Sequence, residues 1–131
     1  MRLTRSPAAW CASFLLLVAA GTHIPLIGMH LEEAPYIGWL FIALSVVCVV
    51  LAVAIVLVDN PGVWVLSGAV CLAAVVGYLA SRTIGLPQIR DDVGNWTEPL
   101  GIPAVASEVL MAALAWWHLR SRRSAPAVRA S

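Results

Sequence analysis

The sequence predicts an all-α protein, an antiparallel bundle of four transmembrane helices that forms one domain over residues 1–131. Hydrophobic residues make up 61% of the chain and charged residues only 11%, whereas a soluble domain carries about 25% charged residues. Four apolar stretches are each long enough to cross a bilayer, because a helix needs about 20 residues to do so. Contact with the lipid bilayer is therefore expected for most of the chain.

The first apolar stretch, 7–29, follows Arg2 and Arg5 and has the basic start of a signal peptide. The run 18–20, Val-Ala-Ala, resembles a cleavage site. The stretch nevertheless continues past Ala20 to Met29, which favours a retained spanning helix over a cleaved leader. A short outer link, 30–35, is expected to follow.

The second and third stretches, 36–58 and 63–82, are separated by the turn sequence Asp-Asn-Pro-Gly at 59–62. Proline and glycine there end one helix and begin the next, which predicts a helix hairpin. Small residues recur every four positions on the third stretch and would let another helix approach closely. They predict a membrane-protein partner or a second copy, unless the abundance of alanine places them by chance. These residues are Ala69, Ala73, Gly77 and Ser81.

The fourth stretch, 101–119, is preceded by a long outer loop and followed by a basic tail, 120–131. The loop has about 18 residues, a length that is unusual unless the segment is functional or mobile. We expect Ile84, Leu86 and Ile89 to lie on the bundle and Trp96 to anchor the returning chain. The charged residues 90–92 should lie in water, and the tail should be disordered.

The distribution of arginine predicts the orientation. The positive-inside rule places the arginine-rich side, which holds both termini, in the cytoplasm, so the protein is expected in the cytoplasmic membrane. No basic helix with interleaved aromatic residues supports nucleic-acid binding. The predicted cytoplasmic side carries Arg2, Arg5, Arg120, Arg122, Arg123 and Arg129, and the other side carries Arg82 and Arg90.

The tryptophans near the predicted cytoplasmic ends of the spans, Trp64 among them, suit a membrane interface. His118 lies at the same end of the fourth stretch. It is therefore too far from His23 and His30, near the opposite face, to share a haem iron with either.

Two ionisable residues lie inside the spans, where they are costly and usually face a protein interior. His23 and Glu108 each lie about seven residues, roughly 10 Å, below the outer surface. Tyr78 and Arg82 end the third stretch at a nearby depth. The sequence thus predicts a buried polar cluster of His23, Tyr78, Arg82 and Glu108. Its role is either structural, with Glu108 paired to Arg82 or His23, or functional, as a metal site or proton relay.

Histidine and carboxylate groups near the outer face suit a transition metal. The candidate ligands are His23, His30, Glu33 and Glu108, although their spacing matches no metal-binding signature. His23 and His30 lie about 10 Å apart along a straight helix, so only unwinding near Pro25 would bring them together. The loop adds candidate outer residues, for which a solvated acidic surface is the alternative reading. These are Asp91, Asp92, Trp96 and Glu98.

Three segments resemble a group of small uncharacterised bacterial membrane proteins. They are His-Leu-Glu-Glu-Ala-Pro at 30–35, Ser-Arg-Thr-Ile-Gly-Leu-Pro at 81–87 and Trp-Thr-Glu-Pro at 96–99, together with Glu108. The resemblance covers most of the chain. It implies four spans and these candidate positions, and it implies no activity.

Three functions remain open. The first is a non-enzymatic accessory or structural membrane protein. The second is an outward-facing metal- or haem-handling protein. The third is an oligomeric transporter or channel subunit in which Glu108 lines the path. No phosphate-binding loop or nucleophile motif indicates catalysis, so the sequence leans against an enzyme.

Overall fold

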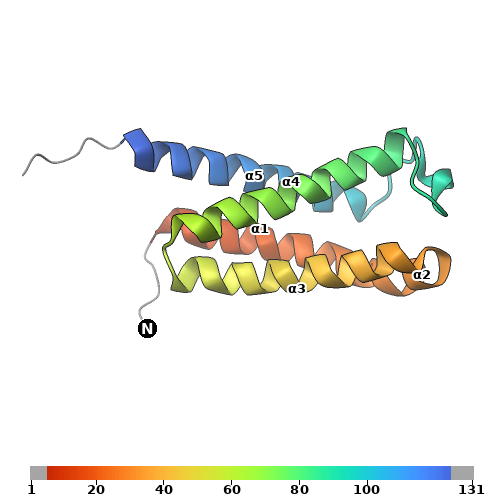
Figure 1. Ribbon diagram of the computed structural model, residues 1–131, viewed down its shortest axis with the longest axis horizontal. Coiled ribbons are helices and arrows are strands. Elements are labelled where there is room, and N and C mark those ends of the chain that lie inside the picture. The colour runs from red at the N-terminus through yellow and green to blue at the C-terminus, as the bar shows by residue number, and fades with distance from the viewer. Residues whose placement is uncertain (1–5, 125–131) are drawn as a thin grey trace, which may run out of the picture.

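The computed structural model describes residues 6–124, and this part of the chain is helical except for its links. Four helices are long and apolar enough to cross a membrane, which confirms the all-α prediction with four candidate spans. Figure 1 shows them side by side along the long axis. The elements are α1 (Pro7–His23), η1 (Ile24–Leu26), α2 (Ile27–Glu33), α3 (Pro35–Leu57), α4 (Pro61–Thr83), η2 (Arg90–Asp92) and α5 (Gly101–Ser124).

Proline sets the helix starts. Pro7, Pro35 and Pro61 each begin a helix, where the missing N–H costs nothing and the fixed φ suits helical geometry. Asn60 caps α4, since its Oδ1 accepts a hydrogen bond of 2.7 Å from the Gly62 N–H. Pro25 lies inside η1, where the loss of a donor replaces α-helical geometry by a 3-10 turn.

Two expected boundaries are wrong. The outer link after the first span is not 30–35, because α2 continues to Glu33 and only Ala34 separates it from α3. The tail is not irregular from residue 120, because α5 continues to Ser124. Arginine near a helix C-terminus is favourable, and Arg122 forms an ion pair with Asp59. Residues 125–131 of the predicted tail lie outside the described part.

Helix α1 is the centre of the bundle. Ala9, Ala12, Leu16 and Ala19 are all fully buried, at spacings of three and four residues that form one helical stripe. Helices α3 and α5 both pack on α1, and α4 packs on α5. Helix α3 makes few contacts with α4, its neighbour in sequence. Helix α4 is therefore the most peripheral of the four.

The small-residue stripe predicted on α4 does not carry its packing within the chain. Ala69, Ala73 and Gly77 are exposed, and a Cβ added at Gly77 would meet nothing within 4 Å. Helix α4 packs instead through a face that includes Trp64 and Gly68. A Cβ added at Gly68 would lie 3.0 Å from the Ala115 Cβ of α5.

The loop between α4 and α5 lies on the bundle as expected for two of the three apolar residues singled out in the sequence. Ile89 is buried with residues of α3, and Leu86 packs beside it. The Tyr36 hydroxyl donates a hydrogen bond of 2.7 Å to the Pro87 carbonyl. Ile84, by contrast, is 82% exposed, so the expectation is wrong at that position.

The first prediction concerns Gly38, where α2 folds back onto α3. A Cβ at this position would lie 2.6 Å from Leu31 Cδ2 and 2.8 Å from the Leu31 backbone N. We expect Gly38→Ala to lower the free energy of unfolding by roughly 1–3 kcal/mol through overpacking. Thermal unfolding in detergent measures it.

Gly28→Ala is the matched control, because a Cβ at Gly28 meets nothing within 4 Å. Equal Tm values for the two variants would contradict the close approach of α2 and α3.

Candidate functional site

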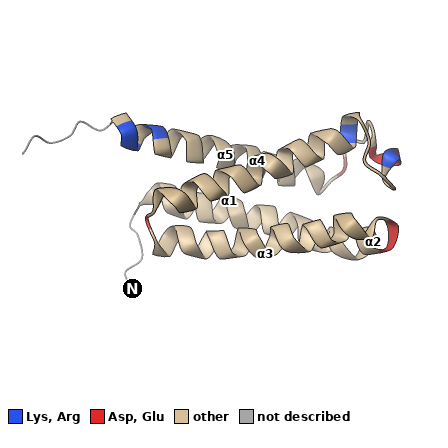
Figure 2. Ribbon diagram, viewed as in Figure 1, with Lys and Arg blue, Asp and Glu red and all other residues tan. Residues whose placement is uncertain are grey.

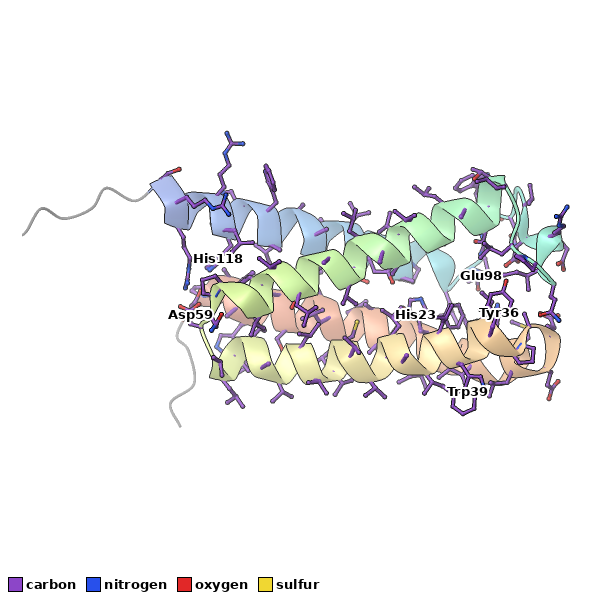
Figure 3. All side chains as sticks on the ribbon, in the orientation of Figure 1. His23, Tyr36, Trp39, Asp59, Glu98 and His118 are labelled. Atoms are coloured by element: carbon purple, nitrogen blue, oxygen red, sulfur yellow. The ribbon has the colours of Figure 1, made fainter. Side chains whose placement is uncertain are left out.

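Charged residues gather at the two ends of the bundle, as Figure 2 shows. Glu108 is the exception on α5, since it is buried to 2% exposure. Its Oε1 lies 3.7 Å from His23 Nε2 on α1, a separation beyond hydrogen-bond length. The same Oε1 has no hydrogen-bond partner. Figure 3 places His23 between the two ends of the bundle.

Backbone carbonyls orient both outer histidines. His23 Nδ1 donates to the Ala19 carbonyl at 2.8 Å, and His30 Nδ1 donates to the Leu26 carbonyl at 2.9 Å. A carbonyl oxygen can only accept, so each Nδ1 carries the proton and each Nε2 is an acceptor in the neutral ring. When Glu108 is ionised, His23 Nε2 and Glu108 Oε1 are therefore two acceptors that face each other.

Phe41 of α3 contacts both histidines by its ring. Its centroid lies 4.7 Å from that of His23 and 4.9 Å from that of His30, edge to face in both pairs. The aromatic ring thus covers the two imidazoles from the side of α3.

Arg82 is paired with the loop between α4 and α5 and not with Glu108. Its Nη1 lies 2.9 Å from Asp92 Oδ2, and the guanidinium lies 4.9 Å from the centroid of the Tyr78 ring. The Arg82 side chain is 7% exposed, and its Nε has no partner. The four predicted cluster residues therefore fall into two groups, His23 with Glu108 and Tyr78 with Arg82.

The loop residues singled out in the sequence have separate roles. Trp96 lies edge to face with Tyr78 at 6.1 Å. Glu98 accepts hydrogen bonds from the Leu100 and Gly101 N–H groups at the start of α5. Asp91 is exposed.

Within residues 6–124, no three His, Cys, Asp or Glu side chains form a group that could hold a metal ion. The proposed ligands His23, His30, Glu33 and Glu108 do not gather as such a set. Of these four residues, only His23 and Glu108 lie within ion-pair distance of each other.

A partly open cavity of about 640 Å³ joins the two polar groups. It lies where α3 and α4 diverge, with His23, Arg82 and Glu108 among its lining residues. Leu40 of α3 and Gly77 of α4 also line it, and both are exposed. The cavity therefore reaches the lateral surface of the bundle between these two helices.

The opposite end holds a buried stack that the sequence did not predict. Trp64 is fully buried instead of facing the membrane interface, and its ring stacks on His118 with centroids 3.8 Å apart. Figure 3 shows His118 and Asp59 near each other at that end. The stack depends on which faces of α4 and α5 meet, and a spacing pattern in one helix does not contain that information.

Comparisons with protein-family models, curated proteins and solved structures found no match to this chain. The candidate site is therefore argued from its geometry.

The second prediction tests the link between Arg82 and the loop. We expect Asp92→Asn to loosen residues 84–100, because it leaves a buried guanidinium without its charged partner. A double-mutant cycle with Arg82→Gln should give a coupling energy on the order of 0.5–3 kcal/mol. Hydrogen exchange of the loop amides reports the loosening.

Asp91→Asn is the control, since Asp91 is an exposed neighbour with the same side chain. Faster exchange in Asp91→Asn than in Asp92→Asn would overturn this account of how the loop is held.

Proposed function

We propose that the chain is a non-enzymatic accessory protein of the cytoplasmic membrane that binds a lipophilic small molecule in its outer half. The four apolar helices fit a small multi-pass membrane protein. One observation carries the proposal, the cavity that leads from the lateral surface between α3 and α4 to the buried Glu108.

The proposed topology is an antiparallel bundle with both termini in the cytoplasm. In Figure 1, α1 begins and α5 ends at the end of the bundle where α3 is linked to α4. That end carries Arg120, Arg122 and Arg123 in the last turns of α5. The positive-inside rule assigns it to the cytoplasm, and the cavity then lies in the outer half.

The shape of the cavity favours binding over a purely structural role. Ligand sites are concave and mostly apolar, with a few polar groups that orient the ligand. Leu44 and Val47 of α3 and Val70 and Ala74 of α4 supply apolar walls. If Glu108 had only a structural role as a paired residue, its Oε1 would accept a hydrogen bond from the partner. This atom has no hydrogen-bond partner.

The metal-handling alternative rests on one pair of atoms. Zinc binds histidine nitrogen and carboxylate oxygen at about 2.0–2.2 Å, so His23 Nε2 and Glu108 Oε1, 3.7 Å apart, could share one ion. Stoichiometric iron, copper or zinc in the purified protein would favour this function over lipophile binding.

The third prediction tests the orientation. In a chain whose native cysteines are replaced by alanine, we expect a membrane-impermeant maleimide to label Asp91→Cys in intact cells and to leave Arg120→Cys unlabelled. Lysed cells serve as the control, in which both should react. Labelling of Arg120→Cys alone in intact cells would invert the topology and place the cavity in the inner half.

The fourth prediction tests the cavity with tritiated dodecanol, a neutral lipophile. We expect saturable binding to the protein in lipid nanodiscs, beyond partition into nanodiscs without protein. Gly77→Leu should weaken this binding roughly tenfold or more, because the larger side chain occupies space at the opening.

Gly21→Leu is the matched control, since a Cβ at Gly21 also meets nothing within 4 Å and the residue does not line the cavity. Absence of saturable binding to the native chain, or equal losses in both variants, would refute the proposed function.

A further inference from the structure

We infer that the ligand of this cavity carries a protonated amine as its head group and a hydrocarbon chain as its tail. The inference rests on the proposed function, since it names the chemical class of ligand for the same cavity. It is carried by the charges that line the cavity and by the two acceptors at its inner end.

The charged residues among those that line the cavity are mainly acidic. Arg82 is the one arginine in the lining, and Asp92 offsets its charge at 2.9 Å. Five carboxylates line the same space, and Glu98 is engaged by backbone N–H groups at the start of α5. The carboxylates in the lining are Glu33, Asp91, Asp92, Glu98 and Glu108.

Once Asp92 and Glu98 are assigned, three carboxylates remain for a ligand. Glu33 and Asp91 are exposed, so they form an acidic rim on the cavity that attracts a cation. Glu108 is buried at 2% exposure, and its Oε1 lacks a hydrogen-bond partner. The charge on the lining is therefore complementary to a cationic head.

The buried end of the cavity needs hydrogen-bond donors. Glu108 Oε1 and His23 Nε2 are both acceptors and lie 3.7 Å apart. An ammonium group has several N–H donors and no acceptor, so one group can donate to both atoms. Its bond to the carboxylate is charge-assisted, which makes it stronger than a bond between neutral groups.

An aromatic neighbour suits the same head group. Phe41 lines the cavity, and aromatic faces attract cations, whereas the Tyr78 ring is already in contact with Arg82. A carboxylate or phosphate head would meet the Glu108 carboxylate and the lone pair of His23 Nε2, and the Arg82 charge is already offset. A hydroxyl head has a single donor and satisfies one acceptor only.

The tail follows from the lateral opening. The apolar walls of α3 and α4 lead from the polar end to the exposed positions Leu40 and Gly77. A hydrocarbon chain bound there would continue into the lipid beside the bundle. The ligand class is thus an amphiphile that enters from the membrane with its cationic head inward.

Competition for bound tritiated dodecanol tests the head group directly. Dodecylamine, dodecanol and dodecanoate share one tail length and differ in head charge. On the native chain in nanodiscs, we expect dodecylamine to compete at roughly tenfold lower concentration than dodecanol, because charge-assisted hydrogen bonds are the stronger ones. Dodecanoate should be the weakest competitor.

Glu108→Gln should abolish the advantage of dodecylamine over dodecanol, measured as the amine-to-alcohol ratio, the ratio of the concentrations at which the two compete. Glu32→Gln is the matched control, because Glu32 is exposed and does not line the cavity. Because the amine-to-alcohol ratio is compared between variants, differences between the two compounds in partition into lipid cancel. Should Glu108→Gln lose dodecanol binding through misfolding, Glu33→Gln at the acidic rim must reduce the same ratio.

The outcomes separate the inference from the proposed function. Strongest competition by dodecanoate, equal competition by all three, or an amine advantage that survives Glu108→Gln would overturn the head group while leaving the cavity as a lipophile site. If Glu108→Gln is misfolded, an amine-to-alcohol ratio that is unchanged in Glu33→Gln overturns the head group as well. Failure of dodecanol itself to bind the native chain would remove the proposed function.

Discussion

The close packing of α1 against α3 and α5 is the constraint on which the rest of the bundle depends. Without a hydrophobic driving force between helices in lipid, association depends on how closely backbones approach. The alanine stripe on α1 allows that approach on both sides. Helix α1 lies between α3 and α5, and α4 packs on α5. The hairpin helices α3 and α4 therefore make few contacts with each other.

The cavity is a consequence of this arrangement. Where α3 and α4 diverge, no side chain closes the space, and residues from α1 and α5 form its inner wall. His23 and Glu108 come from those two helices, so the two central helices also supply the polar end of the cavity. Buried polar groups without partners are costly, which is why the open acceptors point to a bound molecule.

The sequence predicted four spanning helices because apolar length is a local property, and it predicted that His23 and Glu108 lie at one depth because depth follows from counting residues. It could not predict that Arg82 turns to Asp92, since partner choice depends on helix rotation and on the path of the loop. The stripe of Ala69, Ala73, Gly77 and Ser81 was predicted to receive a partner or a second copy and stays a prediction, whereas the alanines that pack within the bundle lie on α1. Composition alone does not show which of two small-residue stripes packs against other helices of the bundle.

Disulfide trapping between α3 and α4 tests most directly whether these helices stay apart at the end of the bundle that holds the cavity. Cys48 of α3 and Cys71 of α4 both belong to the buried core, so this native pair reports the half where the helices meet. Leu40→Cys with Gly77→Cys, in a chain otherwise free of cysteine, places thiols on either side of the cavity. A disulfide needs Cα atoms within about 7 Å. We predict that oxidation in membranes leaves the Leu40→Cys, Gly77→Cys pair reduced, whereas rapid and complete cross-linking would contradict the cavity.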